Sequence, residues 1–260
     1  MTPLPKFSVI KTDFDALLEC TGQIVILVSD DQKLDAVSSW INKVTKGALE
    51  RFLCSEEFKN LLLGNTLSLS YPTDLYAKSV MIAKINSNAT VAQARSCGVK
   101  ITKALTCEKI LLVGGKFGRI VDLVEGMAMR NYEYLDQKTN TDPKPLDVRV
   151  MVDNIASQAA EIDTKMAMVD GVFFTRDLIN APANVLTTTV FASELSALAE
   201  LGIAVEVFDE SALEKLGMRT LLCVGQGSDS PSKVVVMQWN GGGDEAPFAL
   251  VGKGVVFDTG

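Results

Sequence analysis

The sequence predicts an α/β protein in which one long helix joins two α/β units. Short apolar segments alternate with segments of helical periodicity along the chain, which is typical of α/β layers with mostly parallel strands. Several apolar runs are nearly continuous, as in strands that are buried on both faces. A helical pattern extends from Asn154 through Leu178. We therefore expect an N-terminal unit over residues 1–152, a connecting helix over residues 153–174 and a second unit over residues 175–260.

The N-terminal unit is expected to alternate strands and helices. Residues 66–70 alternate apolar and polar side chains, which is typical of an edge strand. The other expected strands are residues 23–29, 79–84, 109–113 and 147–152. The expected helices, from apolar residues at helical spacing, are residues 35–54, 90–105 and 121–135. A polar break that contains proline, at residues 136–145, predicts an exposed loop.

The second unit follows a helix end at Asn180-Ala181-Pro182, where the proline biases the preceding residue away from helical geometry. Thr187, Thr188 and Thr189 are N-cap candidates for the next helix, which continues to about Leu201, and Thr188 fits best. The expected strands are residues 204–208, 221–224, 233–239 and 248–260, with a short helix at residues 211–216. The last strand is expected to be buried, because its residues are mostly apolar.

Composition and charge argue against several classes of function. The chain has 47% hydrophobic and 22% charged residues, as a globular protein does, and its net charge of −7 argues against nucleic-acid and anionic-membrane surfaces. It contains no uncharged apolar stretch of about 18 residues, so no membrane span is expected. Residues 1–11 lack a signal-peptide pattern, and the five cysteines lack CxxC spacing. Both features predict a cytoplasmic protein with reduced thiols.

The most informative count is that of histidine, which is absent from the chain. Ser-His-Asp and Cys-His catalysis are therefore excluded within these residues, as are zinc sites of the HExxH type. Any metal would be held by carboxylates, carbonyls, water or an amine, which suits Mn, Mg or an unusual Zn site. General-base chemistry would depend on Asp, Glu, Lys or a metal-bound hydroxide.

The glycine-rich segments do not match nucleotide-binding motifs. A P-loop requires a glycine five residues before its Gly-Lys pair and a serine or threonine after the lysine. Around Lys116 those positions hold Ile110 and Phe117. Residues 225–228, Gly-Gln-Gly-Ser, do not continue into GxGxxG. We expect residues 114–118 and residues 225–228 to form turns.

Lys253 and Asp258 are the candidate metal ligands. Lys253 interrupts an apolar run, where a lysine is costly unless it has a partner, and Asp258 follows at the far end of the run. A neutral amine and a carboxylate are together suited to a divalent metal, but two ligands are too few for any cation. An alternative stays open: Lys253, flanked by Gly252 and Gly254, lies at a strand bulge and pairs with a nearby carboxylate.

Arg176, Asp177, Asn180 and Asn184 form a second polar cluster. The favoured interpretation is the C-terminal end of a helix. Arginine is stabilised near the negative end of the helix dipole, and asparagine tolerates turn geometry. We therefore expect a structural role for this cluster.

Four segments in this order resemble the leucyl aminopeptidases, the cytosol aminopeptidase family. They are Val124-Glu125-Gly126 continuing to Tyr132, Thr175 to Thr187, Leu216-Gly217-Met218 through Ser228, and Phe248 to Gly260. The resemblance is weak over the first hundred residues and strong from Thr175 onward. It implies a smaller N-terminal α/β domain, a connecting helix and the first part of a C-terminal α/β metallopeptidase domain.

The resemblance also implies a chemistry. Family members carry two divalent metal ions, usually Zn or Mn, and a metal-bridged water attacks the first peptide bond of a peptide substrate. Lys253 matches the family's metal-binding lysine, and Asp258 matches the aspartate that bridges both metals. A leucine-type aminopeptidase is the implied activity, in a cytoplasmic homo-oligomer that is a hexamer in the family. Some bacterial relatives also bind DNA, but the acidic charge argues against that here.

The family's catalytic lysine, its other carboxylate ligands and the arginine of its Asn-Thr-Asp-Ala-Glu-Gly-Arg motif are expected downstream of Gly260. No catalytic residue is therefore assigned in this chain, and its substrate-binding residues are unknown. We expect the isolated 260 residues to be inactive as a peptidase. An alternative from another class is a non-catalytic binding or assembly module, or a truncated-gene product that retains the N-terminal domain.

Overall fold

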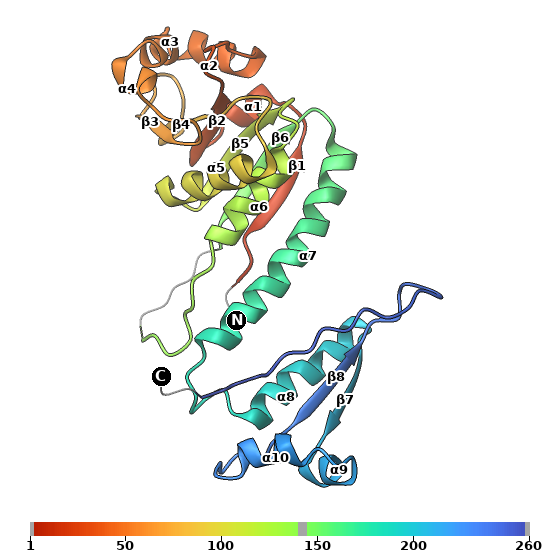
Figure 1. Cartoon of the computed structure of the whole chain (residues 1–260). Helices are drawn as coiled ribbons and strands as arrows, with labels where there is room; N and C mark the ends of the chain where they lie inside the picture. Colours follow the sequence, from red (N-terminus) through yellow and green to blue (C-terminus); the bar gives the residue numbers. More distant parts are fainter. Residues whose placement is uncertain (1–2, 140–144, 258–260) are drawn as a thin grey trace. The chain divides into compact units, whose positions relative to one another are not determined.

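The computed structural model describes residues 3–139 and 145–257 (Figure 1). The chain separates into two compact units, Met1–Thr175 and Arg176–Gly260. A single helix, α7 (Ile155–Asn180), forms over the segment where the sequence predicts a connecting helix.

The first unit is built on a six-stranded sheet with the strand order β1-β6-β5-β2-β4-β3. All neighbouring strands are parallel except β3 and β4, which are antiparallel. The strands are β1 (Lys6–Ile10), β2 (Gln23–Val28), β3 (Thr66–Ser70), β4 (Ser79–Lys84), β5 (Lys109–Gly115) and β6 (Asp147–Val152). The predicted α/β fold with mostly parallel strands is confirmed, and β3 is an edge strand as expected. Strand β1 was not predicted.

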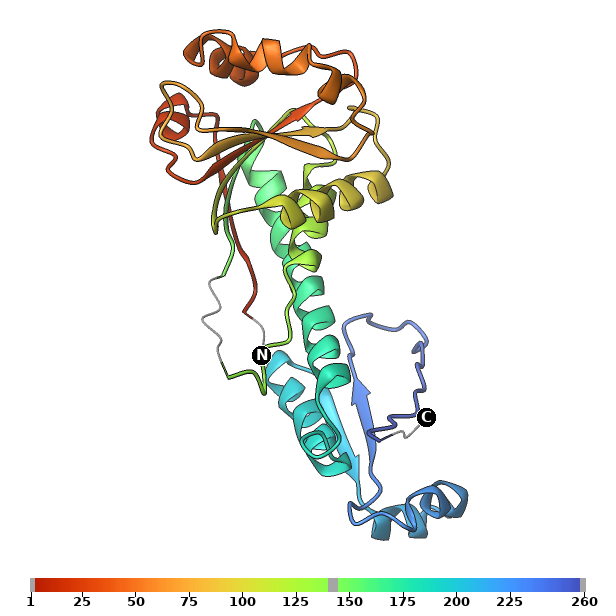
Figure 2. The same ribbon diagram turned by 90° about the vertical axis from the view of Figure 1, so that its left-hand side faces the viewer.

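Helices cover both faces of this sheet (Figure 2). On one face lie α5 (Val91–Ala104), α6 (Ile120–Arg130) and, through Ile162, part of α7. The other face is covered by α1 (Phe14–Leu18), α2 (Ala36–Val44), α3 (Ala48–Leu53) and α4 (Glu56–Lys59). Each face therefore has its own apolar core, which explains why the central strands are nearly continuous apolar runs.

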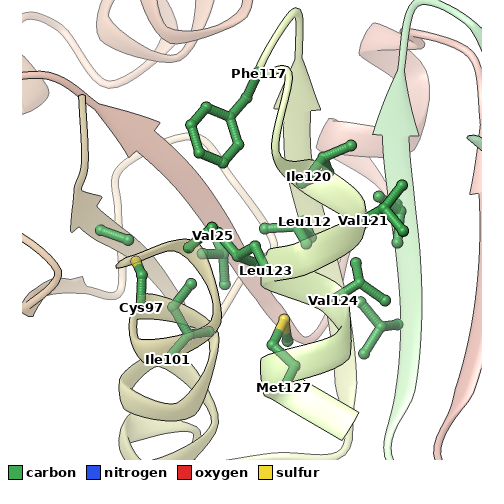
Figure 3. Close-up of a cluster of buried hydrophobic side chains, with 14 of the residues drawn as sticks. Val25, Cys97, Ile101, Leu112, Phe117, Ile120, Val121, Leu123, Val124 and Met127 are labelled. Atoms are coloured by element: carbon green, nitrogen blue, oxygen red, sulfur yellow. The ribbon is translucent and has the colours of Figure 1, made fainter. Parts of the chain in front are cut away.

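Glycines allow helices α5 and α6 to pack closely against each other. A Cβ added at Gly98 would clash with the carbonyl oxygen of Leu123, and one added at Gly126 would clash with that of Arg95. Figure 3 shows the apolar side chains that fill the space beneath, among them Val25, Cys97, Ile101, Leu112, Leu123 and Met127. Burial raises the pKa of the Cys97 thiol to about 12, so this cysteine is a core residue.

Two predicted helices of the first unit are wrong in extent. The segment 35–54 forms two helices, because Lys46 (φ 54°) and Gly47 (φ 77°) adopt left-handed geometry between α2 and α3. The Lys46 amide donates to the carbonyl of Lys43 and the Gly47 amide to that of Asn42, the two bonds of a Schellman motif that ends α2. Helix α6 ends at Arg130, before the predicted end at residue 135. Part of the predicted loop at residues 136–145 lies outside the described residues.

The second unit contains a two-stranded antiparallel sheet of β7 (Ala204–Phe208) and β8 (Val234–Gln238). Its helices are α8 (Thr188–Ala197), the 3₁₀ helix η1 (Leu198–Leu201), α9 (Glu210–Lys215) and α10 (Arg219–Gly225). Thr187, rather than the predicted Thr188, caps α8, because its Oγ1 accepts the amide of Val190 at 3.3 Å.

Two predicted strands of the second unit do not form. Residues 221–224 lie in α10, where the Leu222 amide donates to the carbonyl of Met218. A four-residue apolar run fits a helix as well as a strand, so its pattern could not distinguish them. The predicted closing strand has no regular structure over its described residues 248–257, and Val251 is 98% exposed. A buried strand requires neighbouring strands, and in this unit β7 and β8 pair only with each other within the described residues.

Candidate functional site

Lys253 lies on an exposed segment of the second unit, between two glycines. Among the described residues its ammonium makes no salt bridge. The backbone beside it passes close to α8, because a Cβ added at Gly254 would lie 2.7 Å from Cε1 of Phe191. A larger residue at position 254 would therefore require the Phe191 ring to shift. The alternative interpretation, a lysine at a strand bulge, is wrong because no strand forms there.

Asp258 lies outside the described residues, so its role as a metal ligand stays a prediction. Within residues 3–139 and 145–257, no group of three or more His, Cys, Asp or Glu side chains could hold a metal ion. A cation needs more ligands than one amine and one carboxylate. The described residues therefore do not fit a pair of metal ions by themselves.

The polar cluster at the end of α7 has a structural role, as expected. Asn180 is the last residue of the helix, and its Nδ2 donates to the carbonyl of Arg176 at 2.9 Å. The Ala181 amide donates to the carbonyl of Asp177 at 2.9 Å. Both bonds lie in the last turn of the helix and close its C-terminal end.

The segment Gly225–Ser228 forms a turn, as predicted. The Ser228 amide donates to the carbonyl of Gly225 at 2.9 Å. The segment also lies close to Ser232, whose Oγ would clash with a Cβ at position 225. A larger residue at position 225 would require the Ser232 hydroxyl to rotate away.

A buried carboxylate in the first unit belongs to a segment that carries the family resemblance. Glu125 on α6 is only 4% exposed, and its Oε2 lies close to three nitrogen atoms. Arg95 Nε of α5 donates to it at 3.1 Å, and Arg95 Nη2 and Lys165 Nζ of α7 form salt bridges with it, each at 3.0 Å. A buried charge is tolerated when it is paired in this way. The three side chains therefore connect three helices, which the sequence alone did not reveal.

A second buried charge, Lys84, lies at the end of β4. Its ammonium lies 2.9 Å from Asp30 Oδ1 and donates to the carbonyl of Leu61 at 2.9 Å. It also lies 5.1 Å from the ring centroid of Phe58, which adds a cation–π contact. Lys84 thus holds the end of α4 against the sheet, and its ammonium is already paired with protein groups.

Two shallow pockets lie in the first unit. One, of about 280 Å³, is lined by residues that include Gly64, Asn86 and Gln93. The other, of about 270 Å³, is lined by residues that include Cys20, Lys109 and Arg149. Neither contains Lys253, so neither belongs to the predicted metal site.

Among the described residues, no helix is both long enough and apolar enough to cross a membrane.

The whole chain and its C-terminal part are both similar to known proteins. Residues 173–260 match the model of the cytosol aminopeptidase family, catalytic domain. A probable cytosol aminopeptidase of Dinoroseobacter shibae is 44% identical over 260 residues, which are 100% of this chain and 53% of that protein. The chain belongs to the cytosol aminopeptidase family. A second relative with the same name, from Cereibacter sphaeroides, is 43% identical over 95% of this chain and 51% of its own length.

Two solved structures are similar in fold. A tomato leucine aminopeptidase mutant superposes with a TM-score of 0.70 at 16% identity, over 90% of this chain and 51% of that one. The bottromycin maturation enzyme BotP in complex with Mn has a TM-score of 0.62 at 21% identity, over 84% and 45%. The chain spans about half the length of the cytosol aminopeptidases it matches. The family's match region includes the Lys253 segment.

Proposed function

We propose that this chain is part of a metal-dependent aminopeptidase of the leucyl type, which removes N-terminal residues from peptides. The observation that carries the proposal is the match of residues 173–260 to the catalytic domain of the cytosol aminopeptidase family. Two relatives more than 40% identical, which the chain covers over about half their length, bear the same family name. The activity is proposed for the longer protein type and not for the 260 residues alone.

Lys253 and Asp258 are the proposed protein ligands in this chain for two divalent metal ions, Mn or Zn. The absence of histidine supports an amine and carboxylate site, and BotP is a structural neighbour solved with Mn. A lysine ligand must be neutral, which burial and a nearby cation favour. When bound, such metals activate water and polarise the substrate carbonyl.

The exposed position of Lys253 has a consequence for the isolated chain. Lys253 is exposed, and among the described residues no group of three or more His, Cys, Asp or Glu side chains could hold a metal ion. Lys253 must therefore acquire both burial and additional ligands before it can bind a metal. We infer that the 260-residue chain alone neither binds the metal pair tightly nor hydrolyses peptides.

A chimera tests this proposal. Residues 1–260 would be continued by the remaining C-terminal part of the Dinoroseobacter relative, whose matching part is 44% identical. We expect hydrolysis of leucine p-nitroanilide that depends on Mn or Zn and is abolished by a chelator. The 260-residue chain alone, under the same conditions, is expected to show none.

Circular dichroism and metal analysis of both proteins provide the control, because they separate misfolding from inactivity. Robust turnover by the 260-residue chain alone would contradict its expected inactivity. A folded, metal-loaded chimera that fails to hydrolyse any aminoacyl p-nitroanilide would contradict the proposed function.

A further inference from the structure

The two edges of the six-stranded sheet differ in how they are protected. Edge strands usually carry lysine or proline, which prevents pairing with another strand. Strand β1 has Pro5 before it, Lys6 at its start and Lys11 after its end. Strand β3 has the sequence Thr-Leu-Ser-Leu-Ser and contains no charged residue. The outer edge of β3 is therefore the less protected of the two.

The hydrogen bonds of β3 show which backbone groups face outward. The Tyr71 amide donates to the carbonyl of Lys78 at 2.8 Å, and the Lys84 amide donates to that of Asn65 at 3.0 Å. Residues of an antiparallel strand alternate between bonding inward and outward, so residues 67 and 69 also bond to β4. Thr66, Ser68 and Ser70 consequently direct their backbone groups to the outer edge. Within the described chain, β4 is the only strand that pairs with β3.

Exposed apolar side chains flank this edge. Leu62 is 73% exposed, Tyr71 is 84% exposed and Tyr76 is 79% exposed, and Leu63 is also exposed. Leu62 and Leu63 precede β3, whereas the two tyrosines lie in the connection from β3 to β4. Large apolar side chains gathered around an open strand edge are typical of an interaction surface.

We propose that β3 pairs antiparallel with β3 of a second copy of this chain, about a two-fold axis at Ser68. This register brings together the residues whose backbone groups face outward: Ser68 opposes Ser68, and Thr66 opposes Ser70. It also places Leu67 opposite Leu69 on the apolar face, where non-hydrogen-bonded pairs bring side chains closest. No charge opposes another charge within the strand. The sequence of β3 is therefore self-complementary, as a two-fold interface requires.

The exposed apolar residues Leu63 and Tyr71 lie just outside the two ends of β3. The backbone turns there, since Gly64 (φ 82°) and Tyr71 (φ 48°) adopt left-handed geometry, so the proposed register extends over residues 66–70. The two sheets would form one continuous sheet, an arrangement in which main-chain hydrogen bonds supply affinity. This inference does not depend on the proposed peptidase function.

Sedimentation velocity of the 260-residue chain at micromolar concentrations is the first test. We expect a monomer–dimer equilibrium that Ser68→Pro weakens, with the dimer dissociation constant rising at least about tenfold. Proline at this position removes an outward amide, and edge strands tolerate proline there, so the β3–β4 ladder stays intact. Ser68→Thr, which retains the amide, is the matched control and should dimerise like the natural chain.

Oxidative cross-linking tests the register and does not depend on how Ser68→Pro folds. Ser68→Cys places the two introduced thiols on a pair with a Cα separation of about 5.5 Å, which a disulfide can span. Ser70→Cys is the control, because its two thiols would lie about 13 Å apart along the strands. Cross-linking of Ser68→Cys well above both Ser70→Cys and the natural chain is expected.

Three results would overturn the inference. A monomer at every concentration would exclude the dimer. A dimer that a folded Ser68→Pro variant leaves unchanged would place the interface elsewhere, for example on the exposed segment of the second unit. Equal cross-linking of Ser68→Cys and Ser70→Cys would exclude the proposed register.

Discussion

Single backbone atoms determine which residues the contact between α5 and α6 tolerates. At Gly98 and Gly126 the position of an added Cβ is occupied by a carbonyl oxygen of the opposing helix. A backbone oxygen cannot move aside as a flexible side chain can. Alanine at either position would therefore push the two helices apart, along with the core beneath them (Figure 3).

We predict that Gly126→Ala lowers the free energy of unfolding of the first unit by about 2 kcal/mol. Overpacking typically costs about 1–3 kcal/mol, and the better helix propensity of alanine returns about 1 kcal/mol at most. Urea unfolding followed by Trp40 fluorescence, in a Trp239→Phe background, reports on this unit alone. Gly171→Ala in α7 is the control, because no heavy atom lies within 4 Å of its added Cβ, and it should be neutral or stabilising. An unchanged stability of Gly126→Ala would contradict the described helix contact.

The partners of Lys84 and Lys253 could not be predicted from the sequence. Each lies in or at the end of an apolar run, and the run alone predicts a partner without identifying it. For Lys84 the partners are Asp30 and carbonyls at the end of α4, more than twenty residues away. For Lys253 the described structure supplies no partner. The identity of a partner depends on tertiary packing, so only the family resemblance distinguished the two lysines.

At the scale of secondary-structure elements, α7 is held to the first unit by both charge and apolar contact. Lys165 reaches the buried Glu125, and Phe173 packs edge-on against Tyr132 with ring centroids 5.1 Å apart. Val169 and Phe173 are buried in a small cluster with Ala128. The buried face of α7 therefore packs on α6 and on the residues around it.

We predict that Glu125→Gln lowers the stability of the first unit by about 2 kcal/mol. Removing one partner of a buried ion pair typically costs about 3–5 kcal/mol, and we expect less here because Arg95 and Lys165 are partly exposed to water. Relative to the natural chain, hydrogen exchange of Glu125→Gln should be accelerated more in the first part of α7 than in β2. The exposed pair of Lys138 and Glu133 provides the control, because Lys138→Met should change stability by less than about 0.5 kcal/mol. Unchanged protection of α7 in Glu125→Gln would contradict the connecting role of Glu125.

The elements that could be predicted from sequence are those with a strong local pattern. Strands β2, β4, β5 and β6 are apolar runs bounded by polar or glycine residues, and α5 begins at Thr90 with a capping box. The helical state of the short apolar run in α10 could not be predicted, because it depends on neighbouring elements. The break at Gly47 could not be predicted either, because it depends on the geometry of a single turn. The strand predicted over residues 248–257 does not form for another reason. Its apolar composition favours a buried strand, and burial requires neighbouring strands that the described chain does not provide.

At the scale of the whole molecule, the two units differ in how much apolar surface they bury. The sheet of the first unit has an apolar core on each face. In the second unit, Phe248, Leu250 and Val251 are exposed, although the family's match region includes them. In the chimera we expect these side chains to become buried and Lys253 to gain further ligands.

The most direct test of the central claim, that Lys253 is a metal ligand of an aminopeptidase, is the Lys253→Met chimera. We predict that kcat/KM for leucine p-nitroanilide falls at least about 100-fold, with loss of bound metal measured by mass spectrometry. Lys215→Met, which removes an exposed lysine of the same unit at the end of α9, should leave both activity and metal content unchanged. A folded Lys253→Met chimera with undiminished activity and metal content would contradict the claim.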